Sequence, residues 1–310
     1  MDKRKHIFEI PTINDGAADF LALINLHNKI IKSLERITPE EYDIKLSFSN
    51  CNFIRQNAIA YLGAISTFLK DKGFIVYYDF NSMKDSIVNI LKADGFLGNN
   101  FGGRFANNYE HSDKAVPFKN FKGDLQTNEQ LSGSIVDYVS KEWLKDSRIS
   151  IKPALKNDLC AKMYELFANA LEHSNSNLGC FACGQTYSSG EKDETVLTIV
   201  DLGIGIANSV KKYIENTGKS IENDEAIKWA FKNGNTTRPD QSGGIGLALV
   251  YDFLKLNNGF MDVYCNNVSL RIDKGKRNVR FIDADFSGTM INIRIWHSEN
   301  TSYGYREEFE

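Results

Sequence analysis

The sequence predicts an α/β protein with two domains, and three observations lead to that prediction. The chain has 310 residues, which exceeds the size that one hydrophobic core usually organises. In residues 1–98, segments with the two-residue alternation of strands take turns with segments of helical periodicity. In residues 131–298, helices come first and strands bunch towards the end, which indicates an α/β sandwich: a mixed sheet with helices on one face.

The elements of the first half follow from local patterns. Residues 44–48, I-K-L-S-F, alternate apolar and polar side chains like a half-buried strand. Residues 57–72 carry apolar groups at helical spacing, and Gly73 follows as a stop signal. By the same criteria we expect strands at 6–11 and 74–80 and helices at 16–36 and 84–94.

Residues 99–130 change character and predict a linker, because they are rich in Gly and Asn; V-P-F-K-N-F within them reads as one short strand. The polar tail, 299–310, is expected to be loosely held. The remaining elements follow from periodicity: helices at 130–146, 153–173, 222–233 and 245–257, and strands at 178–187, 195–201, 260–265, 268–272, 278–282 and 288–296.

Composition restricts the class of protein. The formal net charge of -3 argues against a nucleic-acid or anionic-membrane partner, which would favour a basic surface. No run approaches the roughly 20 apolar residues that span a bilayer, and the N-terminus lacks an apolar signal core. The five scattered cysteines predict reduced thiols in a cytoplasmic protein. Cys180 and Cys183 form one C-x-x-C, but without a second pair nearby they read as strand residues, not zinc ligands.

The stretch E-L-F-A-N-A-L-E-H, 165–173, places three polar groups in an apolar helix. Glu165, Asn169 and His173 follow at four-residue steps, so they drift only about 40° around the helix axis and share one face. The opposite stripe is apolar and can pack on a sheet. The polar face alone is compatible with plain solvent-exposed surface.

A second stretch, 195–206, reads T-V-L-T-I-V-D-L-G-I-G-I. A predicted strand ends in Asp201, and Gly203 and Gly205 follow. A carboxylate at a strand end can accept a hydrogen bond from an exocyclic amine, and glycines allow close backbone approach. A strand followed by an ordinary D-x-G turn gives the same pattern.

A third stretch, 241–250, reads Q-S-G-G-I-G-L-A-L-V. Glycines that open a helix present free N–H groups and the positive end of the helix dipole, which suits phosphate. The spacing is not that of a P-loop, and the stretch does not follow a strand of a βαβ unit, which argues against a dinucleotide fold.

The order E-x-x-x-N on a helix, D-x-G-x-G after a strand and G-G-x-G-L at a helix start resembles the GHKL superfamily. This is the ATP-binding domain shared by gyrase, heat-shock chaperones, sensor histidine kinases and mismatch-repair ATPases. The resemblance covers residues 130–297 and includes G-T-M-I-N-I-R-I, which is similar to the closing strand of the family. It implies ATP and Mg²⁺ as cofactors.

The resemblance also implies roles for individual residues. Asn169 would hold Mg²⁺ on the phosphates, and Asp201 would accept a hydrogen bond from the adenine amine. Gly203 and Gly205 would let base and ribose lie against the backbone, and residues 207–242 would form a mobile lid. The remaining implied contacts are Thr289 beneath the adenine, backbone N–H groups of Gly244, Gly246 and Leu247 at the phosphates, and Thr236, Thr237 and Arg238 near the γ-phosphate, where Arg238 would stabilise charge.

Residues 5–98 resemble a second family, the STAS domain of anti-sigma-factor antagonists. The resemblance follows the strand, turn and helix of 44–62 and the strand and helix that come next. STAS antagonists carry D-S-S-G where this chain has R-Q-N-A, so Asn57 stands at the phosphorylatable serine. Asparagine has no hydroxyl, so this region would bind another protein or dock on its own ATPase domain.

Three functions remain open on these grounds. The chain is expected to be a regulatory Mg-ATP-binding protein, either an ATP-gated switch or an anti-sigma-type serine kinase that acts on a protein partner. A slow ATPase with Glu165 as general base is the second option, and a non-catalytic interaction module is the third. A sensor histidine kinase is disfavoured, because the helical histidine upstream, His27, lacks the acidic neighbour of a phosphoacceptor. The partner would bind the STAS-like domain or the lid, and a homodimer is compatible with the sequence.

Overall fold

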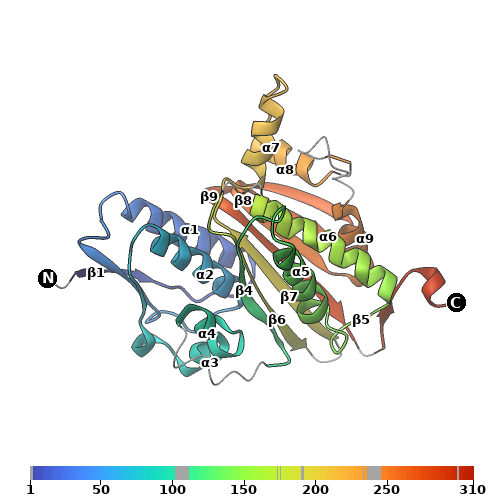
Figure 1. Ribbon diagram of the computed structural model, residues 1–310, viewed down its shortest axis with the longest axis horizontal. Coiled ribbons are helices and arrows are strands. Elements are labelled where there is room, and N and C mark those ends of the chain that lie inside the picture. Colours follow the sequence, from blue (N-terminus) through green and yellow to red (C-terminus); the bar gives the residue numbers. More distant parts are fainter. Residues whose placement is uncertain are drawn as a thin grey trace.

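The computed structural model describes residues 3–101, 112–172, 174, 176–189, 192–232, 234–235, 246–298 and 300–310. The described part stacks two sheets and two layers of helices in alternation (Figure 1). A three-stranded sheet lies on the outside, followed by helices α1 and α2, a five-stranded sheet and a final layer of helices. The α/β class predicted from the sequence is therefore confirmed.

The outer sheet is parallel and comes from the N-terminal part of the chain. Its strands are ordered β1-β2-β3, with Phe8, Leu46 and Tyr78 in neighbouring register positions. Two successive right-handed crossovers in the same direction place α1 and α2 on the same face of this sheet. The elements span β1 Arg4–Glu9, α1 Ala17–Ser33, β2 Tyr42–Ser47, α2 Gln56–Asp71 and β3 Val76–Tyr78.

The second sheet has five strands in the order β4-β6-β7-β9-β8, and every described pairing in it is antiparallel. This corrects the predicted mixed sheet: parallel and antiparallel pairings occur in different sheets, because hairpins connect β6 to β7 and β8 to β9. The predicted strand pairs 260–265 with 268–272 and 278–282 with 288–296 each join into one bent strand. The strands are β4 Ala115–Phe121, β6 Cys180–Ser189, β7 Lys192–Asp201, β8 Phe260–Asp273 and β9 Lys276–His297.

Three helices cover one face of the five-stranded sheet. Helix α6 lies beside α9, and its apolar side chains meet Leu197 and Ile199 of β7 and Ile293 of β9 in one buried cluster. These strand residues alternate with Val196 and Val200, which point to the opposite face. The helices are α5 Glu129–Asp137, followed by a π-helical turn Tyr138–Trp143, α6 Pro153–Glu172 and α9 Gly246–Asn257.

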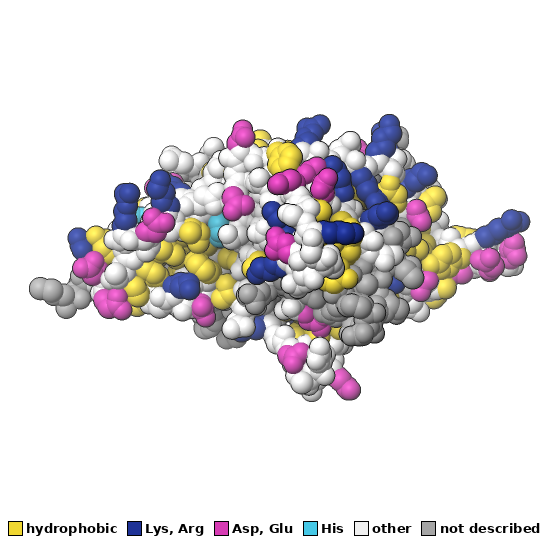
Figure 2. All heavy atoms as spheres, turned by 90° about the horizontal axis from the view of Figure 1, so that it is seen from above, with side chains coloured by type: hydrophobic (Ala, Val, Ile, Leu, Met, Phe, Trp, Pro, Cys, Tyr) yellow, Lys and Arg dark blue, Asp and Glu magenta, His cyan; other side chains and the backbone are white. Residues whose placement is uncertain are grey.

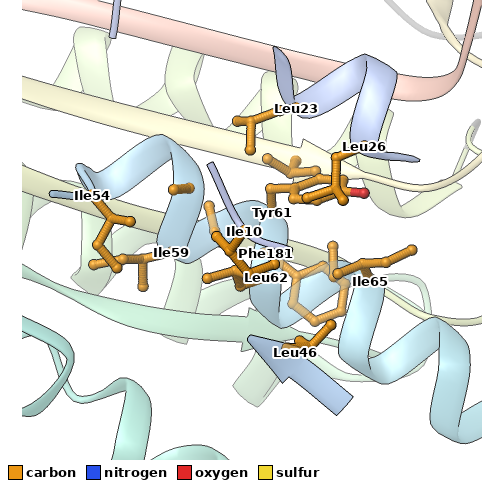
Figure 3. Packing of buried hydrophobic residues seen from close by; sticks show 14 of the residues in the cluster. Ile10, Leu23, Leu26, Leu46, Ile54, Ile59, Tyr61, Leu62, Ile65 and Phe181 are labelled. Atoms are coloured by element: carbon orange, nitrogen blue, oxygen red, sulfur yellow. The ribbon is translucent and has the colours of Figure 1, made fainter. Parts of the chain in front are cut away.

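The other face of this sheet is covered by α1 and α2, so the prediction of helices on one face is wrong. Helix α2 is buried on all sides over residues 56–66, because it lies between the two sheets. Figure 3 shows Leu62 and Ile65 of α2 packed between Leu46 of β2 and Phe181 of β6. A side chain at Gly63 would come within 2.4 Å of the Phe118 ring, so the close packing of α2 on β4 requires glycine there.

A partly buried cluster of four charges also joins α2 to the five-stranded sheet. The Arg294 guanidinium on β9 donates to Asp15 and, at 2.8 Å, to Glu194 of β7. Arg55, just before α2, lies 3.3 Å from Asp15 and 3.9 Å from Glu194. It also stacks over the Tyr187 ring of β6 at 3.9 Å. The charges of two arginines and two carboxylates therefore balance where the N-terminal region contacts the five-stranded sheet.

The segment R-Q-N-A lies in this contact. Asn57 is fully buried, and its amide donates to the Asn14 carbonyl at 2.7 Å. Gln56 accepts a hydrogen bond from the Tyr187 hydroxyl of β6 at 2.8 Å. The N-terminal region thus contacts the five-stranded sheet through this segment.

A two-domain layout is not confirmed. One continuous buried cluster contains residues from β1, α1 and α2 together with Phe181, Val200 and Met290 of the five-stranded sheet. The short strand predicted at V-P-F-K-N-F is confirmed as β4, but it is an edge strand of the five-stranded sheet and not part of a linker. Two short helices, α3 Asp85–Ala93 and α4 Phe96–Phe101, lead from β3 to β4.

The C-terminal tail is docked rather than loose. Residues Ser302–Tyr303 form β10, which pairs in parallel with β5, Ser150–Ile151. The Glu308 carboxylate accepts the free N–H groups of Ala154 and Leu155 at 2.8 and 3.4 Å, which caps the N-terminus of α6. The tail therefore stabilises the helix that carries Glu165 and Asn169.

No helix of the described residues combines the length and the hydropathy needed to cross a bilayer. All five cysteines are free and buried. Cys180 and Cys183 belong to the clusters on opposite faces of the five-stranded sheet, so they do not chelate one metal ion together.

Candidate nucleotide site

Asp201 is the last residue of β7 and lies in the middle of the five-stranded sheet. Its neighbours in register are Thr289 of β9 and Cys180 of β6. The side chain is 4% exposed, and it accepts hydrogen bonds from the Gly203 N–H at 3.0 Å and from the hydroxyl and N–H of Thr289. Burial raises the pKa of Asp201 to about 7, against the opposing effect of these hydrogen bonds. The sequence prediction that Asp201 and Thr289 act at one place is consistent with this contact.

The loop after β7 is packed against the segment that follows α6. The Ile204 N–H donates to the Ser174 carbonyl at 2.8 Å. A Cβ at Gly203 would lie 2.1 Å from the same carbonyl oxygen, so only glycine fits there. Gly205 has a φ of +80° and is the N-cap of α7, Ile206–Glu215. Contacts within the protein thus already require both glycines, and the prediction that base and ribose lie against them stays a prediction.

Asn266 of β8 fixes the other side of this loop. Its amide donates to the Ile204 carbonyl at 3.0 Å and accepts from the Asn208 N–H at 3.3 Å. It has a φ of +50° at the irregular register that bends β8. Sequence analysis missed this residue and Ser174, although the Asn-Asn pair between two predicted strands was a turn signal.

Helix α6 has the predicted core face and polar face. Met163, Leu166 and Phe167 are buried in the cluster under the five-stranded sheet. Asn169 is exposed, and Glu165 is partly exposed and forms an ion pair with Lys162 at 3.1 Å. His173 lies outside the described residues.

Asn169 lies towards the end of α6 that meets the Asp201 loop. Ser174 follows it by five residues, which is about 7 Å along a helix axis. Because Ser174 accepts the Ile204 N–H, the C-terminal end of α6 and the end of β7 meet at one edge of the five-stranded sheet. An exposed amide oxygen at Asn169 is a hard ligand of the type that Mg²⁺ takes.

Of the predicted phosphate-binding stretch, 241–250, the structure describes residues 246–250. Gly246 and Leu247 form the first turn of α9, where backbone N–H groups have no partner within the helix. Helix α9 lies beside α6 on the same face of the five-stranded sheet. Thr236, Thr237, Arg238 and Gly244 lie outside the described residues.

The predicted lid contains two helices, α7 and α8, Asn223–Ala230. They project from the edge of the five-stranded sheet near the Asp201 loop (Figure 1). Tyr213 and Trp229 pack against each other with ring centroids 5.6 Å apart, and Ala207 and Val210 are buried against β8. The described part of this segment is therefore packed on the same buried cluster that holds α6 and α9 on the five-stranded sheet.

His27 does not have the surroundings of a phosphoacceptor. It is 3% exposed and lies edge-on to the rings of Tyr61 and Phe286. Burial lowers the pKa of His27 to about 4, so the ring is neutral at physiological pH.

The described residues contain no group of three or more His, Cys, Asp or Glu that could hold a metal ion by itself. Comparisons with models of known protein families and with curated proteins gave no match. The candidate site is therefore supported by the sequence motifs and by the positions of Asp201, α6 and α9.

Proposed function

We propose that the chain is a regulatory protein that binds Mg-ATP in the manner of the GHKL superfamily. The observation that carries this proposal is the position of Asp201. A buried carboxyl at a strand end lies against a glycine loop, and that loop contacts the C-terminal end of the helix that bears Asn169. This juxtaposition joins two of the three sequence motifs through hydrogen bonds.

Each part has a role in this proposal. Asp201 accepts a hydrogen bond from the adenine amine, and Thr289 lies beside it beneath the base. Asn169 provides one oxygen ligand, while phosphates and water complete the coordination of Mg²⁺. The first N–H groups of α9 receive the phosphates. Bound Mg-ATP supplies a γ-phosphate and a charge that can bias the position of the lid.

The contacts of Glu165 favour a switch over an ATPase. A general base must point its carboxylate at the attacking water, whereas Glu165 forms an ion pair with Lys162 of its own helix. Serine kinase activity needs an acceptor hydroxyl in line with the γ-phosphate, which a partner protein would supply. The proposed protein therefore binds ATP and acts on a partner, and hydrolysis is secondary.

Isothermal titration of the full chain with Mg-ATP tests the binding site. We expect Asn169→Ala to weaken Mg-dependent binding at least tenfold, and Asp201→Asn to lose the preference for ATP over GTP. Asn157→Ala is the matched control, because Asn157 is exposed on the same helix. Asp94→Asn is the control for loss of a buried carboxyl elsewhere in the fold. Wild-type affinity in both site variants would contradict the proposal.

The fate of the γ-phosphate separates the catalytic options. The protein is incubated with Mg-ATP labelled on the γ-phosphate, and the label is followed. Label that stays in protein-bound ATP supports the switch, and transfer to serine of an added partner supports the kinase. Rapid release of free phosphate that depends on Glu165 would overturn the preference for a switch.

A further inference from the structure

The outer half of the β8/β9 hairpin, residues 268–281, forms a bent arm that has no role in the proposed site. One face of this hairpin arm is apolar, and Val268, Leu270 and Ile272 are buried there with residues of α7, α8 and α9. The register places Arg271, Lys276 and Arg280 together on the opposite face, and all three are exposed. The arm therefore presents a basic, solvent-facing surface.

The positive charge on this arm exceeds the negative charge around it. Arg271 pairs with Asp262 at 3.5 Å and stacks over Phe260. No ion pair or side-chain hydrogen bond involves Lys276 or Arg280 among the residues that the structure describes. Within the arm itself the cations are Arg271, Lys274, Lys276, Arg277 and Arg280, against the single carboxylate of Asp273, which lies opposite Lys276 in register. Arg277 is in register with Ile272 and therefore lies on the other face of the arm.

This surplus stands out in a chain whose net charge is -3. Lys and Arg side chains also gather on the face of the molecule seen from above (Figure 2). A local surplus of one sign raises the concentration and association rate of partners of the opposite sign.

The spacing of these cations is fixed by the hairpin. Lys276, Asn278 and Arg280 occupy alternate positions of β9, about 7 Å apart at the usual strand rise. Arg271 lies opposite Asn278 in register. The tip is held on α9, because the Tyr251 hydroxyl donates to the Gly275 carbonyl. A rigid surface of this kind loses little backbone entropy on binding.

We propose that the hairpin arm is a docking surface for an extended acidic segment of a partner protein. Alternate side chains of an extended chain repeat at the same interval of about 7 Å, so successive carboxylates can meet successive cations. The Phe260 ring beside this face is covered by the guanidinium groups of Arg271 and Arg294, which disfavours stacking of a nucleic-acid base on it. Phe281 is 60% exposed, but it is in register with Val268 and lies on the face opposite to Lys276 and Arg280, so no apolar side chain of the described arm stands beside these cations to enter a membrane interface.

Fluorescence anisotropy with a labelled peptide of twelve glutamates tests this surface on the full chain. We expect salt-sensitive binding that weakens about tenfold in the double variant Lys276→Glu/Arg280→Glu. The control Lys70→Glu/Lys92→Glu changes the net charge equally at two exposed positions elsewhere, and should bind like wild type. The milder Lys276→Gln/Arg280→Gln variant, with circular dichroism of each protein, separates lost binding from misfolding.

Three outcomes would overturn the proposal. The wild-type chain could fail to bind the peptide at low salt, or the control variant could lose as much affinity as the test variant. The chain could also bind vesicles of anionic lipid, or single-stranded oligouridylate, more tightly than the peptide and through the same two residues. None of these outcomes depends on ATP, so the failure of this proposal and the failure of the proposed nucleotide site can be told apart.

Discussion

Both faces of the five-stranded sheet bury apolar side chains, but the helices that cover them differ in the polar groups that they leave exposed. On one face, α6 packs a single stripe of apolar side chains on the sheet, while Asn169 is exposed to solvent and Glu165 is partly exposed. On the other face, α2 is enclosed between two sheets, and even its polar residues Gln56 and Asn57 are buried and hydrogen-bonded. Asn169 of α6 is therefore open to a ligand, whereas Gln56 and Asn57 of α2 are not.

Similar helical patterns therefore end in different surroundings. The side chains of Gln56 and Asn57 on α2 form hydrogen bonds within the molecule, whereas Asn169 of α6 is exposed to solvent. The α2 face should therefore control stability, and the α6 face should control ligand binding. Three changes test that division.

The largest effect is expected from a cavity in the α2 face. Leu62 is 1% exposed, so Leu62→Ala should lower the free energy of unfolding by about 3 kcal/mol. All three tryptophans lie after residue 130, at 143, 229 and 296, outside the N-terminal region that contains α2. Their fluorescence in urea should follow one transition, shifted by this substitution in the first half.

Lys70→Ala, at an exposed position of the same helix, is the matched control and should leave the transition unchanged. A tryptophan transition that does not respond to Leu62→Ala would mean that the two halves unfold as separate domains. The shared core would then contribute little to their coupling.

A slightly smaller loss is expected from the charge cluster. Arg294→Met leaves Asp15 and Glu194 without their closest cation, at side-chain exposures of 10% and 9%. The loss should be about 2–3 kcal/mol in urea unfolding, because a buried charge without its partner is costly.

Adding Glu194→Gln to Arg294→Met should recover part of that loss, since it removes one of the stranded charges. Lys45→Met, which breaks the more exposed pair with Asp79, should cost less than 1 kcal/mol. If Arg294→Met and Lys45→Met lowered the free energy of unfolding equally, burial would not strengthen the ion pairs of the cluster.

The smallest effect depends on pH and involves Asp94, which is 1% exposed beside Cys183. Burial raises the pKa of Asp94 to about 8 from an ordinary 3.8. The native state therefore holds a proton that the unfolded state releases, so stability falls as pH rises through that interval. Asp94→Asn removes this dependence and should stabilise the protein by about 1–2 kcal/mol at pH 8.5 relative to its effect at pH 7.0.

Thermal unfolding at the two pH values measures this difference. Asp71→Asn at an exposed position should show no such change between pH 7.0 and 8.5. Parallel curves for wild type and Asp94→Asn would mean that Asp94 is charged in the native state and has a partner.

Local patterns were sufficient for most elements and for part of the site. The helix predicted at 153–173 ends within one residue of α6, and the strand at 195–201 ends at Asp201 as β7 does. Both follow from periodicity and from stop signals in the immediate sequence. The acidic end of the tail, R-E-E-F-E, gave no such signal, because the groups that Glu308 caps lie some 150 residues away.

The amino-acid sequence by itself determined most helices and strands, although α4, α7 and the short pair β5 and β10 were not predicted. It also placed polar groups on one stripe of α6 and at the end of β7. Only the tertiary structure decided that α2 is enclosed between two sheets, that β4 joins the larger sheet, and that Ser174 and Asn266 hold the Asp201 loop. The reason is physical: periodicity reports which face of an element is apolar, whereas the neighbour that covers this face depends on contacts between distant segments.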